Sequence, residues 1–476
     1  MQETEEAFWR RPAAAQARAV HRGEVSAVEL VESHLERIAE VNPRANAVTQ
    51  LMADRALEAA AATDRRRAAG EPLGPLAGVP FTVKETTPVE GVPTTFGAQR
   101  FRDFVAPADA PPVARLRAAG AIPIGHANMP TLVLAGMHTR SELFGDTANP
   151  WDPSLTPGGT SGGDAVAVAT GMAALGLGND SGGSIRIPAQ FCGVAGLKPT
   201  TGRFPADHRV LGPDDPGPAS QGLVTDGPLA RRVDDLRLAY EALAGTDPRD
   251  PRAVPVPLYG PPLPGPVKVA VVTDPGGHGV HPAVAAAVAD AAAALRDAGY
   301  DVREVADVPR LDEALEAYDR ITVTEFAPSW PVVRTLLGEG GDRYIRMAME
   351  KTPPVTAGEL VRLMGTWLNI RRSWAEFLDE HPLLLGPSFT EPPVEPGLES
   401  RDAASRDRVA SAMRLCSATS FVGVPAVAVP TGLYAGLPGG VQLVGRAFRE
   451  DLCLDAARAV EDRLGVLTPV DPRPAD

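Results

Sequence analysis

The 476-residue chain has few cysteines and no long apolar run, and both shortages exclude whole classes of protein. Its three cysteines, Cys192, Cys416 and Cys453, are too few and too widely spaced for a disulfide framework or a zinc site. The most apolar stretches, residues 283–295 and 421–433, are interrupted by an aspartate and by prolines, so we expect neither to span a bilayer. The acidic start of the chain is unlike a secretory signal. We therefore expect a cytoplasmic protein in a reducing compartment.

Basic residues are also in short supply. With 46 Lys and Arg against 60 Asp and Glu, the formal net charge is −14. Such a surface repels phosphate backbones and anionic lipids, so we expect no direct nucleic-acid partner and no membrane partner. Aromatic residues make up only 5%, but an apolar fraction of 44% is enough for a large core. The 47 glycines and 48 prolines indicate many tight turns.

Hydrophobic periodicity predicts alternating helices and strands along most of the chain. A capping box at Ser26 begins a helix that we expect to end at Asn42-Pro43, and apolar alternation predicts a strand over residues 79–83. The other expected elements are an apolar helix over residues 164–175, a strand–helix–strand unit over 267–305, mainly helix over 311–380, and core strands over 420–429 and 440–444. This alternation is typical of one large α/β unit.

The glycine-rich segment that ends at Ser184 carries the clearest chemical signal. In Asp180-Ser-Gly-Gly-Ser184 a serine directly follows two glycines. Breaking an amide requires a nucleophile and, close to it, hydrogen-bond donors for the oxyanion that forms. Glycines allow successive backbone N–H groups to converge on one point. We therefore expect the main chain of Ser181, Gly182, Gly183 and Ser184 itself to form an oxyanion hole.

A serine nucleophile also requires a base, and no histidine of this chain lies in a recognisable triad motif. A lysine can act as the base when burial makes its amine neutral. Lys84 follows the apolar segment Phe81-Thr-Val, which can carry the amine into the interior. Lys84 is therefore the candidate base.

Three stretches together resemble the signature of one enzyme family. They are Gly78-Val-Pro-Phe-Thr-Val-Lys84, Pro157-Gly-Gly-Thr-Ser-Gly-Gly163 and Asp180-Ser-Gly-Gly-Ser-Ile-Arg-Ile-Pro188, and the match continues through residues 191–200 and 436–445. On these motifs the chain resembles the amidase signature family over most of its length. The resemblance implies a single α/β domain over residues 1–476, in which a large mixed, twisted β-sheet is covered by helices on both sides. It places the signature core at about residues 75–205 and a variable helical region at about residues 306–380.

The same resemblance implies roles for individual residues. Ser184 is the expected nucleophile, Lys84 the general base, and Thr160 the residue that passes a proton between them. Most members of the family have serine at the position of Thr160, and aspartate is common where this chain has Glu85. Beside the nucleophile, Asp180 and Arg186 are expected to pair and brace the loop.

The implied activity is hydrolysis of a carboxylic amide, or of a related C–N or ester bond, in a small molecule through an acyl-enzyme. Met129, Val133 and Leu134 are candidates for the pocket that holds the acyl group, although ordinary core packing explains them equally well. The family's chemistry implies no metal and no organic cofactor. The expected partner is a small-molecule amide, and the sequence leaves the acyl group, the amine and the oligomeric state open, a homodimer included.

Several alternatives remain open. Gly159-Thr-Ser161-Gly-Gly163 also matches the nucleophile elbow of α/β-hydrolases, with Ser161 as nucleophile and His381 as the last available histidine. The glutaminase-type A subunit of a tRNA-dependent amidotransferase shares the motifs, but such subunits usually carry an acidic residue and phenylalanine where this chain has Thr131 and Leu132. Acyl transfer to an amine in biosynthesis and a catalytically silent binding protein are the other two.

Overall fold

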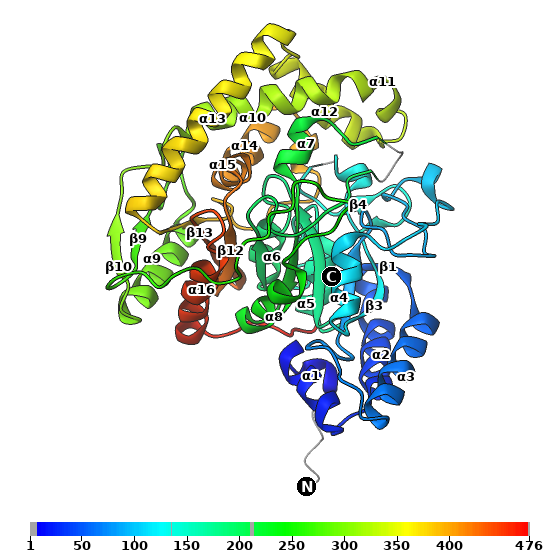
Figure 1. Cartoon of the computed structure of the whole chain (residues 1–476). Helices are drawn as coiled ribbons and strands as arrows, with labels where there is room; N and C mark the ends of the chain where they lie inside the picture. Colours follow the sequence, from blue (N-terminus) through cyan, green and yellow to red (C-terminus); the bar gives the residue numbers. More distant parts are fainter. Residues whose placement is uncertain (1–6, 135, 210–213, 475–476) are drawn as a thin grey trace.

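The computed structural model describes residues 7–134, 136–209 and 214–474 (Figure 1). Within these residues eleven strands form one mixed sheet in the order β1-β3-β2-β6-β8-β7-β12-β13-β11-β9-β10. These strands are β1 Val48–Leu51, β2 Pro80–Lys84, β3 Ile122–Ala127, β6 Leu175–Asp180, β7 Ala195–Lys198, β8 Thr225–Ala230, β9 Lys268–Val271, β10 Asp301–Glu304, β11 Leu383–Pro387, β12 Ala426–Tyr434 and β13 Leu437–Gly445. A separate small sheet pairs β4 Arg140–Ser141 with β5 Gly145–Asp146.

Helices cover both faces of the large sheet. The α-helices of the described residues are α1 Ala13–Arg22, α2 Ala27–Ala45, α3 Ala53–Ala68, α4 Pro111–Ala118, α5 Gly162–Ala169, α6 Arg186–Cys192, α7 Pro218–Leu223, α8 Val233–Leu243, α9 Pro282–Asp297, α10 Leu311–Phe326, α11 Trp330–Val333, α12 Glu339–Lys351, α13 Ala357–Glu380, α14 Ala403–Ala412, α15 Arg414–Val422 and α16 Glu450–Leu464. One face packs against α4, α8, α9 and α16. The other packs against α2, α3, α5 and α6 and, farther along the sheet, against α10, α13 and α15.

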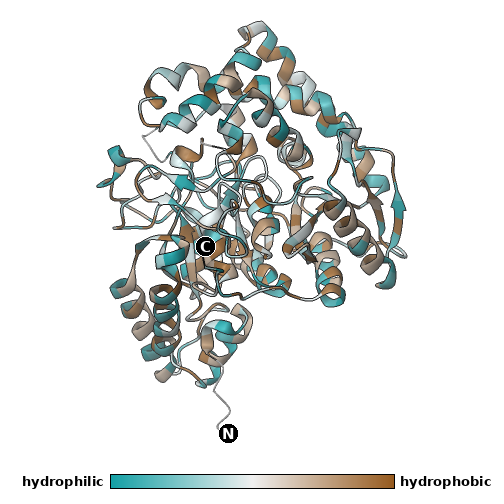
Figure 2. Ribbon diagram, turned by 180° about the vertical axis from the view of Figure 1, so that it is seen from behind, coloured by the Kyte–Doolittle hydropathy of each residue, from teal (hydrophilic) through white to brown (hydrophobic). Residues whose placement is uncertain are grey.

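Alternate residues of a strand point into these opposite cores. On β9, Val269 and Val271 pack with α9 and α16, whereas Ala270 packs with α10 and α13. Side chains of a strand alternate between its faces, so a strand buried on both sides is apolar at every position. The outer helices at the top of Figure 2 carry both hydrophilic and hydrophobic residues along their length, as expected when only one face of a helix meets the core. The predicted α/β architecture, with helices on both sides of the sheet, is confirmed.

Three predicted boundaries are wrong. The helix that begins after Ser26 continues to Ala45, because Pro43 lies in its last turns and removes only one backbone hydrogen bond there. The helix expected over residues 164–175 is instead two elements, since α5 ends at Ala169 and Leu175 begins β6. The segment 414–422 is α15, and the strand expected from residue 420 begins only at Ala426. A buried strand and a buried helix share a continuous apolar pattern, which periodicity alone does not separate.

Two glycines on β6 let α5 lie close to the sheet. A Cβ added to Gly176 would lie 2.9 Å from Asp164 Cβ, and one added to Gly178 would lie 2.6 Å from Ser161 Oγ. Both distances are shorter than side chains tolerate, so larger residues here would push the start of α5 away. The glycines of β6 therefore let the Thr160–Ser161 loop lie directly against the carboxyl-terminal half of β6. No helix in the described part of the chain is both long enough and apolar enough to cross a membrane.

Candidate active site

Lys84, Thr160 and the loop that carries Ser184 lie together at the carboxyl ends of β2 and β6. Lys84 ends β2, and the neighbouring parallel strand β6 leads into the loop that carries Ser184. Thr160 follows a cis peptide bond just before α5, and the Ser161 N–H donates to the Ser184 carbonyl (3.1 Å). The Lys84 amine forms a hydrogen bond with Thr160 Oγ1. Ser184 itself is half-buried.

The Lys84 amine is buried and held at two points. Its side chain has no exposed surface, and Nζ lies 2.7 Å from Asn179 Oδ1 in addition to its bond with Thr160. Burial lowers the pKa of Lys84 from 10.5 to about 7. Three carboxylates oppose this effect, those of Asp164, Asp180 and Asp226. A large fraction of the amine is therefore neutral near pH 7, and only a neutral amine accepts a proton.

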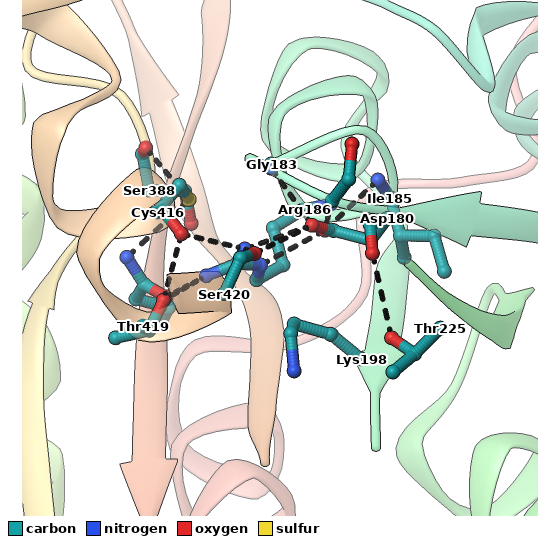
Figure 3. Close-up of polar contacts among 12 residues, drawn as sticks. Asp180, Gly183, Ile185, Arg186, Lys198, Thr225, Ser388, Cys416, Thr419 and Ser420 are labelled. Carbon is teal, nitrogen blue, oxygen red and sulfur yellow. Dashed lines mark hydrogen bonds and ion pairs between the residues drawn. The ribbon is translucent and has the colours of Figure 1, made fainter. Parts of the chain in front are cut away.

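The predicted Asp180–Arg186 pair holds the Ser184 loop (Figure 3). Both side chains are fully buried, and Arg186 donates from Nε to Oδ2 and from Nη2 to Oδ1, each at 2.9 Å. Asp180 also accepts from the N–H groups of Gly183 (2.7 Å) and Ile185 (3.1 Å). Burial alone would raise the pKa of Asp180, but the Arg186 charge and these hydrogen bonds hold it well below its ordinary value. An ionised carboxylate thus fixes the backbone on both sides of Ser184.

One of the four expected oxyanion donors serves the loop itself. The Gly183 N–H already donates to Asp180 Oδ1, and its φ of 125° is a conformation that favours glycine. The Ser181 carbonyl accepts from the Tyr318 hydroxyl (3.3 Å), which fixes the peptide plane that carries the Gly182 N–H. The N–H groups of Ser181, Gly182 and Ser184 therefore remain candidate donors to the oxyanion, whereas the Gly183 N–H holds the loop in shape through Asp180.

The residues expected at the acyl pocket differ in exposure. Met129 is fully buried in an apolar cluster, against which Leu134 packs partly buried. Val133 is 36% exposed, and Leu132 and Val133 both have left-handed backbone, with φ of 55° and 57°. Branched residues in this region are strained, and such strain clusters at functional sites. Val133 and Leu134 thus remain pocket candidates, whereas the Met129 side chain serves the core. The aromatic residues of the cluster are Phe96, Phe101, Phe326, Trp330 and Tyr344.

Glu85, which departs from the family's usual aspartate, ties three segments together. Its buried carboxylate accepts from Thr49 Oγ1 (2.8 Å) and Gln50 Nε2 (2.5 Å), both on β1. It also accepts from the hydroxyl (2.5 Å) and the N–H (3.3 Å) of Thr95. The longer glutamate side chain therefore braces the end of β2, directly beside Lys84, against β1 and the loop at residue 95.

The rival elbow geometry finds no support around Ser161. Among the described residues, the Ser161 hydroxyl forms its hydrogen bonds with the main chain of Asn179, donating to the carbonyl (3.2 Å) and accepting from the N–H (3.4 Å). His381 lies at the end of α13, where it packs on Phe377. Within the described ranges, no cluster of three or more His, Cys, Asp or Glu side chains is arranged to hold a metal ion.

Sequence reasoning missed two residues that contact the site. Asn179 bonds the Lys84 amine, and Tyr318, on α10, bonds the loop at Ser181. Asn179 is a polar residue near the end of a buried strand, which is a usable signal once β6 is recognised as a strand. Tyr318 lies on α10, 134 positions beyond Ser184, and no local pattern connects the two.

Comparison with known proteins decides the family. The profile of the Amidase family matches residues 29–454. The chain belongs to this family. The amidase is 41% identical over 464 residues to "Indoleacetamide hydrolase" of Bradyrhizobium diazoefficiens, covering 96% of this chain and 87% of that one. It is 37% identical over 472 residues to the glutamyl-tRNA(Gln) amidotransferase A subunit of Moorella thermoacetica, covering 93% of this chain and 94% of that one.

Solved structures agree with the sequence relatives. A bacterial aryl acylamidase of the amidase signature family superposes with a TM-score of 0.83 at 27% identity, over 96% of this chain and 97% of that one. The predicted membership of the amidase signature family and the predicted fold are both confirmed. So is the prediction of a small-molecule amidase, which the relatives favour over the tRNA-dependent amidotransferase.

Proposed function

We propose that this amidase hydrolyses the linear carboxamide of an arylacetamide such as indoleacetamide, with Ser184 as nucleophile and Lys84 as base. The observation that carries the proposal is the hydrogen bond between the buried Lys84 amine and Thr160, in the loop that contacts Ser184. A buried amine with its pKa near 7 and a hydroxyl beside it are the parts of a proton relay.

In the acylation half, neutral Lys84 takes the Thr160 hydroxyl proton while Thr160 takes the proton of Ser184. Ser184 Oγ then forms a bond with the amide carbon, and the carbonyl oxygen becomes an oxyanion. The N–H of Gly182, with those of Ser181 and Ser184, stabilises this charge. The proton on Lys84 returns through Thr160 to the leaving nitrogen, the C–N bond breaks, and ammonia departs from a primary amide.

In the deacylation half, water replaces the amine. Thr160 and Lys84 accept its proton in the same sequence, and the hydroxide oxygen attacks the ester carbon. Collapse of the second oxyanion breaks the bond to Ser184, which regains the proton from the relay. One amide and one water thus become one carboxylic acid and one ammonia, and the protein ends in its starting state.

Two observations support an aromatic acyl group. The relative at 41% identity bears the name indoleacetamide hydrolase. In this chain, Leu134 packs against a cluster that contains Phe326, Trp330 and Tyr344, and Val133 next to it is exposed. Aromatic and apolar side chains bind a planar ring by burial and by edge-to-face contact.

The experiment is a comparison of three substrates with the purified chain: indoleacetamide, a short aliphatic amide and free glutamine. Release of indoleacetic acid and ammonia, with kcat/KM at least tenfold above that of the aliphatic amide, is the expected result. Activity on glutamine only, and only with partner proteins present, would favour the second candidate, the glutaminase component of an amidotransferase, to which the 37% identity points. Indoleacetamide offered with hydroxylamine separates hydrolysis from acyl transfer.

We further propose that the amidase works in the cytoplasm, with a homodimer as the assembly to test. The three cysteines are free and buried, which suits a reducing compartment. Light scattering of the purified chain measures the assembly directly, and a single species with the mass of one chain, 49.8 kDa, would rule the dimer out.

A further inference from the structure

We propose that Asn179 is the positioning residue that fixes the direction in which Lys84 exchanges its proton. The inference rests on the proposed function, in which Lys84 is the base. Asn179 lies on β6, one residue before Asp180, and its Oδ1 lies 2.7 Å from Lys84 Nζ. In the described part of the chain, Nζ has two hydrogen-bond partners, the Asn179 amide oxygen and the Thr160 hydroxyl.

These two partners differ in what they can exchange. A neutral amine carries two N–H donors and one lone pair. The amide oxygen of Asn179 only accepts, so Nζ must point an N–H at it, whereas the Thr160 hydroxyl can either donate or accept. With one N–H of the neutral amine bound to Asn179, the lone pair can turn to Thr160, the partner that has a proton to give. Asn179 in this way favours the Thr160-to-Lys84 direction that the relay requires.

Asn179 is itself held so that its oxygen, and not its nitrogen, faces Lys84. Its Nδ2 donates to Thr86 Oγ1 (3.0 Å) on the other side. Its main chain is bound by Ser161 Oγ at both the carbonyl (3.2 Å) and the N–H (3.4 Å). A flipped amide would place an NH2 group against the Lys84 amine, and the Thr86 hydroxyl would then have to donate to the amide oxygen. The Ser161 hydroxyl, which matches the nucleophile position of the elbow motif, thus has a different role. It holds the main chain of Asn179, the residue that orients Lys84.

The neutrality of the Asn179 side chain is as important as its geometry. Lys84 already faces Asp164 on α5, Asp180 on β6 and Asp226 on β8, all of which favour its charged form, and Glu85 follows it on the chain. Asp180 is largely offset by Arg186. A carboxylate in place of the Asn179 amide would stand at hydrogen-bonding distance from Nζ and would stabilise the ammonium form strongly. An amide accepts the same hydrogen bond without adding charge.

The test is the rate at which a fluorophosphonate probe labels Ser184 between pH 5 and pH 10, since this rate reports the base without requiring the natural substrate. N179D keeps the shape and the acceptor but adds charge. We expect its rate–pH curve to move at least one unit toward higher pH, with the wild-type rate recovered at high pH. N179L removes the hydrogen-bond acceptor of the Lys84 amine. We expect about 10–100-fold slower labelling at every pH, because the amine is then no longer oriented toward Thr160.

The matched control is N149D, the same change at a buried asparagine away from Lys84. Asn149 donates to Thr156 O (3.0 Å) and Phe191 O (3.3 Å), so N149D is expected to lower the melting temperature and leave the pH midpoint in place. A wild-type midpoint in N179D, or a wild-type rate in N179L if N179D does not fold, overturns the inference. Absence of labelling at Ser184 in the wild-type chain overturns the proposed function instead, so the two failures are distinguishable.

Discussion

Arg186 and Asp180 form a doubly hydrogen-bonded ion pair in which both side chains are fully buried. The pair joins distant parts of the chain, because Arg186 also donates to groups on α15 and β13. On α15 they are the Cys416 carbonyl, Thr419 Oγ1 and Ser420 Oγ (Figure 3). On β13 the acceptor is Gln442 Oε1. The loop that carries Ser184 is therefore anchored to α15 and β13, in the carboxyl-terminal third of the chain.

Asp180→Asn should destabilise the protein by about 3–5 kcal/mol, since it leaves the buried Arg186 charge without its partner. Urea unfolding followed by circular dichroism measures the change. The control is Arg22→Leu, which removes the exposed ion pair with Glu24 and should change stability little. A loss below about 1 kcal/mol in Asp180→Asn would show that the pair is not a main anchor of the loop.

Ser184→Ala should abolish amide hydrolysis while the circular dichroism spectrum stays that of the wild type. The reason is that the proposed acyl-enzyme forms only on the Ser184 hydroxyl. Ser161→Ala should retain measurable activity, reduced because Ser161 holds the main chain of Asn179. The opposite pattern, an active Ser184→Ala and an inactive Ser161→Ala, would transfer the nucleophile to the elbow motif.

Lys84→Ala should lower kcat by about 10²–10⁴-fold, the usual contribution of a general base. Lys84→Arg should not restore activity, because a guanidinium stays charged. In the wild type only the neutral amine accepts a proton, and the pKa of Lys84 is lowered by burial to about 7. Activity should therefore rise as pH increases through about 7 and level off above it. A profile that falls over this range, or an active arginine variant, contradicts the assignment.

Glu85→Ala should lower stability by about 1–3 kcal/mol and should also reduce activity, because the donors of Thr49, Gln50 and Thr95 lose their common acceptor. Glu85→Asp is the informative comparison, since it restores the family's usual residue with a shorter reach. The exposed Glu90→Gln serves as control and should behave like the wild type. Thermal melts and kcat, measured side by side, separate loss of fold from loss of alignment.

The sequence predicted the parts of the site that are local in the chain. The Lys84 strand, the Ser184 loop and the Asp180–Arg186 pair each lie within a short segment whose pattern is clear. Two of the three boundaries that failed lie where a buried helix and a buried strand look alike, as at residues 164–175, and the third is the helix that continues past Pro43. Tyr318 was not predictable, because its contact with Ser181 joins residues 137 positions apart through tertiary packing alone.

Thr160 provides the sharpest test of the relay, because this chain carries threonine where serine is usual. Thr160→Val keeps the branched shape and removes only the hydroxyl that bonds Lys84. It should lose most activity, whereas Thr160→Ser should keep much of it, since the oxygen remains. Valine also leaves the Lys84 amine without one partner, at a cost of about 1–3 kcal/mol, so stability must be measured beside kcat. A folded valine variant with wild-type turnover would remove Thr160 from the proton path, and Lys84 would then have to reach Ser184 directly or through water.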